Sequence, residues 1–126
     1  MSNIPAELKY TKEHVWVKVE GDVATMGVTD YAQEQLGDVL FVDLPEADED
    51  ISAGDVFTEL ESSKTTSEVP TPVSGTIIES NEELDDSPEL INEDAYANWI
   101  VKVKLSDDSE LDELLSAADY EAGLED

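Results

Sequence analysis

The sequence predicts a mainly β protein that forms one domain over residues 1–126, as a sandwich or a flattened barrel. Short apolar or alternating segments recur along the chain, and turn residues separate them. No long polar linker interrupts this pattern. The hydrophobic content of 40% in 126 residues is enough for one buried core. Two segments depart from the β pattern, and they predict a short internal helix and a C-terminal helix.

The first third of the chain predicts a hairpin, a short helix and a buried strand. Residues 14–20 alternate valine with other side chains, which is typical of a half-buried strand with the valines on one face. The glycine–aspartate pair at 21–22 is a turn signal before a second strand. Thr29 and Gly37 are typical of the N-cap and the C-terminal stop of a helix. Residues 38–44 are mostly apolar and predict a strand buried on both faces.

The central part predicts a loop followed by three strands. Residues 45–55 have the composition of a loop, and residues 56–62, 66–69 and 74–80 are strand candidates. Lys64 lies between the first two strands, in a polar stretch typical of a turn. We therefore expect a hairpin whose tip carries Lys64 into solvent.

The last third predicts an irregular acidic segment, a strand and an amphipathic helix. Residues 85–98 form the irregular segment, and residues 99–105 alternate again, with Trp99 on the apolar face. Residues 107–123 predict the helix, and Asp107 and Glu110 fit a box at its N-terminus. The expected apolar stripe of this helix consists of Leu111, Leu114, Leu115 and Ala118.

The charge balance argues against several kinds of partner. The chain has 33 Asp and Glu against six Lys and no Arg, for a net charge of −27 at pH 7. Nucleic-acid binding needs clustered Lys or Arg, and anionic membrane surfaces would repel this chain. The acids are spread along the sequence, which favours adaptation to a salty cytoplasm over a local device such as a nucleic-acid mimic. The N-terminus lacks the apolar region of a signal peptide, and no segment is long enough to span a membrane, so we expect a cytoplasmic protein.

The residue inventory argues against most catalytic constellations. The chain has no cysteine and a single histidine, His14. These numbers exclude Cys/His catalysis and zinc sites of the usual ligand sets. No phosphate-binding glycine loop is present. Among 33 acids, a pair of carboxylates carries almost no information. His14 is expected to be an exposed strand residue, and we predict neither a catalytic nor a metal site.

Lys64 is the only Lys or Arg between Glu20 and Val101. It could be an ordinary surface lysine or a point of covalent attachment, and the hairpin geometry alone leaves the two possibilities even. An exposed lysine is mostly protonated and is not a nucleophile by itself. At a hairpin tip, however, an enzyme can dock around it and acylate it. The flexible four-carbon stem would then be the start of a swinging arm.

Five segments of the sequence, taken together in their order and spacing, form a pattern that is highly specific for one protein family. They are YTKEHVWV (10–17), GVTDYAQEQLGDVLFVDLPE (27–46), ESSKTTSEVPTPVSG (61–75), NEELDDSPELINEDAY (81–96) and WIVKVKLSD (99–107). From about Leu8 to Tyr120 the chain resembles the H proteins of the glycine cleavage system, which are non-catalytic lipoyl carriers. The resemblance implies a barrel-sandwich hybrid of the lipoyl/biotinyl-carrier type, with lipoate in an amide bond to Lys64.

The resemblance also implies partners and site residues. The lipoyl arm accepts an aminomethyl group from a pyridoxal-phosphate glycine decarboxylase and delivers it to a tetrahydrofolate-dependent aminomethyltransferase. Dihydrolipoyl dehydrogenase then reoxidises the arm, and a lipoate ligase or lipoyltransferase attaches it. We expect a monomer. The residues implied in recognition by the modifying enzyme are Glu61, Ser62 and Glu68, and the candidates for the cleft that receives the arm are Glu13 and His14.

The chain departs from the family pattern at three of its residues, one of which is Glu68, where relatives often carry aspartate. Val15 stands where relatives commonly carry a glutamate that helps to shield the loaded arm, and Ser63 stands where relatives are often apolar. The triplet Ser63-Lys64-Thr65 fits neither the Asp-Lys-Ala of other lipoyl domains nor the Met-Lys-Met of biotin carriers. Two alternatives stay open: an H-like protein that relays lipoate, and an unmodified acidic interaction module.

Overall fold

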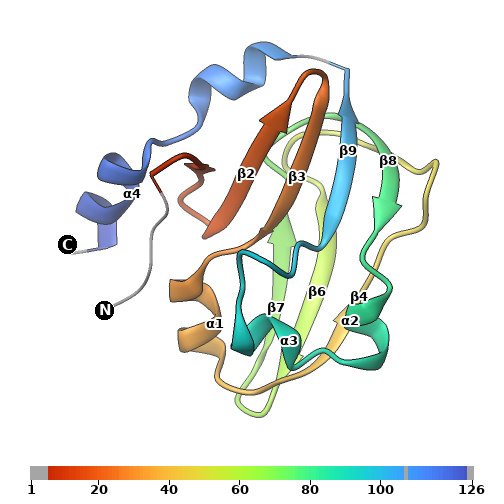
Figure 1. The fold of residues 1–126 in the computed structure, drawn as a ribbon, viewed down its shortest axis with the longest axis vertical. Helices are drawn as coiled ribbons and strands as arrows, with labels where there is room; N and C mark the ends of the chain where they lie inside the picture. The colour runs from red at the N-terminus through yellow and green to blue at the C-terminus, as the bar shows by residue number, and fades with distance from the viewer. Residues whose placement is uncertain (1–5, 107, 125–126) are drawn as a thin grey trace.

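The computed structural model of the chain describes residues 6–106 and 108–124. Its body consists of two antiparallel sheets, one with the strand order β1-β2-β3-β9-β8-β5 and one with the order β4-β6-β7 (Figure 1). The prediction of a mainly β fold with a short internal helix is therefore confirmed. The strands are β1 (Lys9–Tyr10), β2 (Val15–Glu20), β3 (Val23–Val28), β4 (Val39–Asp43), β5 (Asp50–Ile51), β6 (Val56–Ser62), β7 (Thr66–Pro70), β8 (Gly75–Ser80) and β9 (Val101–Leu105). The helices are α1 (Asp30–Leu36), α2 (Glu83–Asp86), α3 (Leu90–Glu93), the 3-10 helix η1 (Asp108–Glu113) and α4 (Ala117–Leu124).

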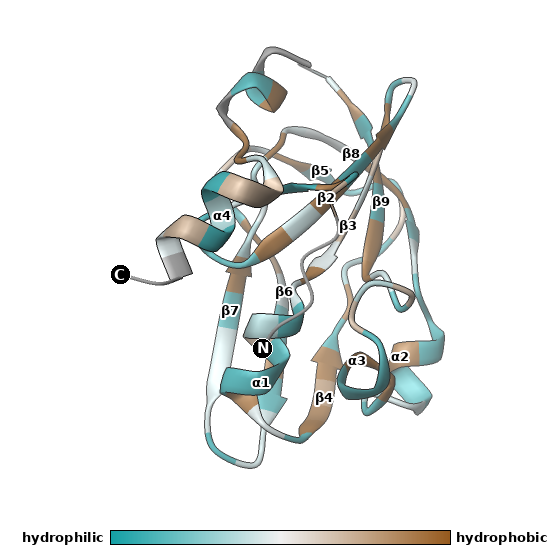
Figure 2. Ribbon diagram, turned by 60° about the vertical axis from the view of Figure 1, so that its left-hand side comes forward, coloured by the Kyte–Doolittle hydropathy of each residue, from teal (hydrophilic) through white to brown (hydrophobic). Residues whose placement is uncertain are grey.

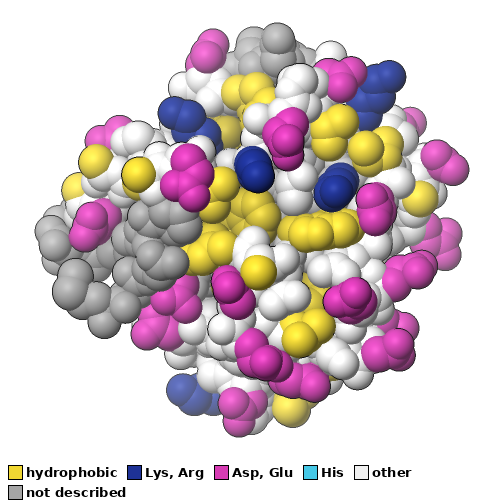
Figure 3. Space-filling view, in the orientation of Figure 1, with side chains coloured by type: hydrophobic (Ala, Val, Ile, Leu, Met, Phe, Trp, Pro, Cys, Tyr) yellow, Lys and Arg dark blue, Asp and Glu magenta, His cyan; other side chains and the backbone are white. Residues whose placement is uncertain are grey.

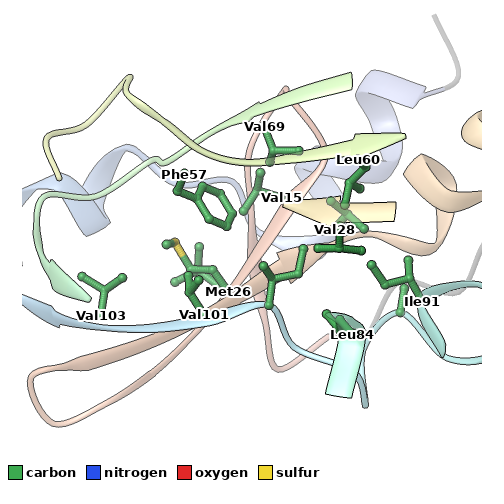
Figure 4. Packing of buried hydrophobic residues seen from close by; sticks show 14 of the residues in the cluster. Val15, Met26, Val28, Phe57, Leu60, Val69, Leu84, Ile91, Val101 and Val103 are labelled. Atoms are coloured by element: carbon green, nitrogen blue, oxygen red, sulfur yellow. The ribbon is translucent and has the colours of Figure 1, made fainter. Parts of the chain in front are cut away.

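The core lies between the two sheets. Val15 and Val101 from the larger sheet and Leu60 and Val69 from the smaller sheet point toward one another, and all four are at most 4% exposed (Figure 4). Full burial of one such side chain contributes about 1.5–3 kcal/mol to folding. The sandwich is therefore held by apolar contacts between strands that are far apart in sequence.

Local signals correctly located the first hairpin and α1. Strands β2 and β3 pair up to Glu20 and Val23, so residues 21–22 form a two-residue turn. The hydroxyl of Thr29 accepts a hydrogen bond from the backbone N–H of Ala32 at the start of α1. Gly37 ends the helix with φ +79°, a left-handed conformation that glycine adopts without steric cost.

The alternation predicted for β2 holds in only part of the strand. Val15, Trp16 and Val17 are all buried, whereas the last residues of the strand are exposed, including Val19 at 37%. Trp16 is buried although it lies on the face opposite the valines, because a second apolar cluster covers that face. This cluster consists of Leu8, Tyr10, Trp16 and Tyr120.

Strand β4 is not buried on both faces, and that prediction is wrong. The strand is apolar over most of its length (Figure 2), but Leu40 is 61% and Phe41 is 44% exposed. It forms an edge of the three-stranded sheet, and its pairing with β6 shifts between Val39 and Phe41. Such a bulge breaks the alternation of faces, so two consecutive side chains can reach solvent.

The predicted C-terminal helix is confirmed as α4, but the segment 107–123 is not one continuous amphipathic helix. It consists of η1 and α4, and the chain between them passes Leu115, whose backbone exchanges hydrogen bonds with Tyr10 at 2.7 and 2.8 Å. This bridge explains the break, because a residue that pairs with a strand cannot continue a helix. Of the predicted stripe, Ala118 is exposed, and the buried anchor of α4 is Tyr120.

The N-terminal box predicted for this helix does not form as expected. Asp107 lies outside the described residues. The carboxylate of Glu110 instead accepts hydrogen bonds from the backbone N–H and the hydroxyl of Ser74, at 2.7 and 2.9 Å. Glu110 thus connects η1 to the loop before β8.

The acidic segment 85–98 is less irregular than predicted. Helices α2 and α3 each form about one turn in or next to it, and they bury Leu84 and Ile91 completely in the core. The loop predicted at 45–55 also contains the two-residue strand β5. No helix in the described ranges has the length and apolarity needed to cross a membrane.

Candidate functional site

Lys64 lies at the tip of the β6–β7 hairpin, as the sequence predicts. The last strand pair is Glu61 opposite Thr66, and residues 63–65 at the tip are all exposed. The tip extends past the end of α1, away from the rest of both sheets (Figure 1). An enzyme can therefore approach Lys64 from solvent.

The turn that carries Lys64 is closed by Ser62. The Ser62 hydroxyl accepts hydrogen bonds from the backbone N–H groups of Lys64 and Thr65, at 3.2 and 3.1 Å, and donates one to the carbonyl of Thr65 at 3.0 Å. The backbone N–H of Ser62 donates to the same carbonyl at 2.8 Å. Ser62 thus satisfies the polar backbone of the turn, so its role in the structure is to shape the tip.

The backbone before Lys64 and the far end of its side chain both lie at the corner between α1 and β4. The backbone N–H of Ser63 donates to the carbonyl of Asp38 at 3.1 Å. A Cβ atom built on Gly37 would lie 3.2 Å from Cε of Lys64 and 3.7 Å from Nζ. Within residues 6–106 and 108–124, the salt bridges are Lys18–Glu20 and Lys102–Glu79, so no described carboxylate holds the Lys64 amine.

Glu61 and Glu68 lie on the outer face of the small sheet, beside the tip. Both side chains are exposed. Glu61 lies opposite Thr66, and Glu59 lies opposite Glu68. Since residues two apart in a strand share a face, the structure brings these carboxylates onto one surface. This surface would be in contact with a protein that docks over Lys64.

His14 is not an exposed strand residue, and that prediction is wrong. It precedes β2, has a φ of +68° and is half-buried. Its Nδ1 atom lies 2.7 Å from the hydroxyl of Tyr120, which lies 2.7 Å from the hydroxyl of Thr29. Burial lowers the pKa of His14, and the nearby Glu13 acts weakly in the opposite direction. Burial raises the pKa of Tyr120 to about 12, although its hydrogen bond with Thr29 opposes this.

A cavity of about 460 Å³ opens next to His14. Its walls include the rings of His14, Tyr31 and Tyr120 and the side chain of Leu115. The His14 and Tyr31 ring centroids are 4.7 Å apart. Glu13 is exposed and is not among the residues that line the cavity, so only one of the two cleft candidates lies there.

Helix α1 connects this cavity to the lysine. Tyr31 lies in its first turn, and Gly37, directly after its last residue, lies next to the end of the Lys64 side chain. At 1.5 Å per residue, these two positions are about 9 Å apart along the helix axis. Sequence reasoning missed Tyr31 and Tyr120, because both meet His14 only in the fold: Tyr31 lies on α1, and Tyr120 is 106 positions away.

Val15, where the chain departs from the family pattern, is part of the core. It is completely buried and lies between the sheets near Phe57 and Val69 (Figure 4). Its side chain therefore does not line the surface that a tethered group could cover. In the described part of the chain, no group of three or more His, Asp or Glu residues is arranged to hold a metal ion.

Comparisons with known proteins agree on one family. The family model described as Glycine cleavage H-protein matches residues 8–126. The chain is 60% identical over 118 residues to a glycine cleavage system H protein of Staphylococcus haemolyticus, which covers 93% of this chain and 94% of that protein. It is 59% identical over 118 residues to the protein of the same name from Staphylococcus saprophyticus, with the same coverage. The crystal structure of a glycine cleavage system H protein from Mycobacterium marinum superposes with a TM-score of 0.88 at 37% identity, over 97% of this chain and 99% of that one.

Proposed function

The chain belongs to the glycine cleavage H-protein family, and we propose that Lys64 is the lysine that carries its lipoate. A protein of this family is the lipoyl carrier of the glycine cleavage system and is not itself an enzyme. Its partners are the three enzymes of that system: the glycine decarboxylase, the aminomethyltransferase and the dihydrolipoyl dehydrogenase.

The observation that carries the proposal is the position of Lys64. Its amine is exposed at a hairpin tip and forms no ion pair with a described residue, so acylation would not break a salt bridge. The turn is closed by Ser62 and is anchored to Asp38, so the backbone keeps its bonds whatever the amine carries. When bound, lipoate supplies the redox-active sulfur pair that this cysteine-free chain lacks.

The chain itself supplies a hydrogen-bonded turn and, on it, a lysine side chain that can move. The tip residues before and after Lys64 are hydrogen-bonded. The four-carbon stem only packs beside Gly37, and no hydrogen bond or ion pair with a described residue holds its amine, so it can leave this position. A tether of this kind keeps the attached group at a high local concentration near any enzyme that binds the protein body. Delivery of the attached group to these enzymes requires no catalytic residue of this chain.

The test is peptide mass mapping of the protein purified from its native host. We expect lipoate on Lys64, and lipoate on another lysine or on none would contradict the proposal. Lys64→Arg should abolish glycine cleavage in a reconstituted system and change the free energy of unfolding by no more than about 0.5 kcal/mol, because the position is exposed. Lys104→Arg, at another exposed lysine, is the matched control and should retain full activity.

We further propose that a lipoate ligase or lipoyltransferase attaches the group and reads the carboxylates beside the tip. Glu61 and Glu68 support this, because both are exposed on the face next to Lys64. Rates of enzymatic lipoylation on the Glu61→Gln and Glu68→Gln variants decide the point, and unchanged rates would remove both residues from the proposal.

Two broader proposals concern the whole protein, and the acidic surface supports the first. Carboxylates are scattered over the described part of the face drawn in Figure 3, with lysines and apolar side chains between them. We propose that this surface suits a cytoplasm rich in salt, and separately that the protein is a monomer. Sedimentation in molar potassium chloride tests the monomer, and a concentration-dependent dimer would contradict it.

A further inference from the structure

We propose that Asn92 is a positioning residue for Lys64. Its side-chain amide holds the corner formed by residues 37–39, and the Lys64 hairpin rests on this corner. The inference deepens the proposed function and depends on it for the role of Lys64. It does not require Asn92 to contact the lysine or the lipoyl group.

Asn92, at the third position of α3, makes three hydrogen bonds to this corner and to the helix before it. Its Nδ2 atom donates to the carbonyl of Gly37 at 2.8 Å and to Oε1 of Gln33 at 3.0 Å. Its Oδ1 atom accepts from the backbone N–H of Val39 at 2.8 Å. Both donor hydrogens and the acceptor oxygen of the amide are therefore used.

The corner needs such a partner because α1 ends there. The last carbonyls of a helix accept no hydrogen bond from within the helix. The last turn of α1 also has no basic residue that could donate to them. Gly37 also leaves the helix at φ +79° and ψ −150°, a conformation that few residues adopt. Asn92 bonds to the carbonyl of Gly37 and to the first N–H of β4, so it fixes the chain on both sides of Asp38.

The same corner holds the hairpin tip. The Asp38 carbonyl, between the two residues that Asn92 binds, accepts the backbone N–H of Ser63 at 3.1 Å. The Lys64 stem lies against Gly37, within 3.2 Å of a Cβ atom built there. The Asp38 carbonyl shares one peptide group with the Val39 N–H that Asn92 binds, and Gly37 directly precedes it. Loosening the corner should therefore free the backbone that carries Lys64.

The test compares Asn92→Asp with Asn98→Asp. Asn92→Asp keeps the size of the side chain and the acceptor for Val39, but it removes both donors and places an oxygen opposite the Gly37 carbonyl. Asn98 also donates to two backbone carbonyls of the same segment, those of Leu90 and Asp94, at 2.9 and 3.0 Å. Its replacement is therefore the same chemical change in the same segment, without contact to the corner.

The first measurement is amide hydrogen exchange of the unmodified protein by NMR. We expect exchange at Ser63 to be about fivefold to tenfold faster in Asn92→Asp, as the loss of one or two ordinary hydrogen bonds implies. Exchange at Leu60 and Val69, in the body of the hairpin, should be unchanged. Asn98→Asp should match the wild-type protein at Ser63. Equal exchange at Ser63 in all three proteins, or equal acceleration in both variants, would overturn the inference.

The second measurement is lipoylation of Lys64 by purified lipoate–protein ligase with lipoic acid and ATP, followed by intact mass. A mispositioned lysine should raise KM about fivefold, by the same estimate, and leave kcat nearly unchanged, because the amine itself is unaltered. Unchanged kcat and KM in Asn92→Asp would contradict the positioning role. If the wild-type chain accepts no lipoate, the proposed function fails, whereas the exchange experiment still decides whether Asn92 holds the tip.

Discussion

His14 shows how the surroundings of a single residue decide its properties. Its pattern in the sequence is that of an exposed strand residue, but its ring lies between Tyr31 and Tyr120 and is half-buried. Burial lowers its pKa, so the folded protein holds this ring neutral at a pH where the unfolded chain would protonate it. Glu13 acts on His14 electrostatically, and the charged residues Lys12 and Asp119 line the same cavity.

The sign of the resulting pH dependence follows from linkage. The unfolded chain protonates His14 near the ordinary pKa of 6.5, whereas the folded protein protonates it only at a lower pH. The free energy of unfolding therefore falls as the pH drops from above 6.5 toward the pKa of the folded state. We expect the free energy of unfolding in urea to fall between about pH 7.5 and about pH 5.5 more steeply in the wild-type protein than in His14→Gln. Carboxylates titrate in both proteins, so the difference between their slopes isolates His14. Parallel slopes would contradict this prediction.

At the scale of elements, α1 connects the two parts of the site. Its N-terminal end borders the cavity through Tyr31, and its C-terminal end supports Lys64 through Gly37. We propose that the free end of the arm, once loaded, rests in this cavity, beside His14. The support is the aromatic lining and the spacing of about 9 Å along the helix.

This proposal predicts a change in the lifetime of the loaded protein. Tyr31→Ala removes one wall of the cavity, so water should reach the aminomethyl group more easily. Hydrolysis should be about twofold to tenfold faster if one aromatic contact of about 0.5–1.5 kcal/mol is lost. Tyr31→Phe keeps the ring and is the control. The measurement is the decay of the loaded form by mass spectrometry. Equal lifetimes in all three proteins would exclude this cavity as the resting place of the arm.

At the scale of the whole molecule, charge repulsion is the dominant electrostatic feature. Six lysines oppose 33 carboxylates, which leaves the net charge of −27, and the described residues form two surface salt bridges. Surface pairs of this kind contribute about 0–1 kcal/mol each. Mobile cations must therefore screen most of the carboxylates.

The fold should consequently depend on salt. The Debye length falls from about 30 Å at 0.01 M salt to about 3 Å at 1 M, so only close neighbours still repel one another at high salt. We expect the thermal midpoint, followed by circular dichroism, to rise across a potassium chloride series. A matched series in sucrose, which strengthens apolar burial without screening, separates the two effects. A midpoint that stays flat from millimolar to molar salt would contradict adaptation to high salt.

The features that the sequence determined by itself are those set by neighbours along the chain. Thr29 and Gly37 mark the ends of α1, residues 21–22 form the first turn, and the strands around Lys64 form a hairpin with the lysine in solvent. Each depends on backbone preferences and hydrogen bonds within a few residues, which the local sequence encodes directly. The extended family pattern around Lys64 likewise indicates the carrier role, because it is a property of residue order and spacing alone.

Only the tertiary structure decided which surfaces are covered and which distant residues meet. Trp16 is buried because the C-terminal Tyr120 covers its cluster, and the predicted C-terminal helix breaks because Leu115 pairs with Tyr10. His14 meets Tyr120 across 106 positions, and Asn92 meets Gly37 across 55. A pattern of apolar and polar residues states which side chains can be buried, but burial and hydrogen bonding between distant residues depend on how the sheets and helices pack. The hairpin that exposes Lys64 is thus encoded locally, whereas the corner and the cavity around it exist only in the folded chain.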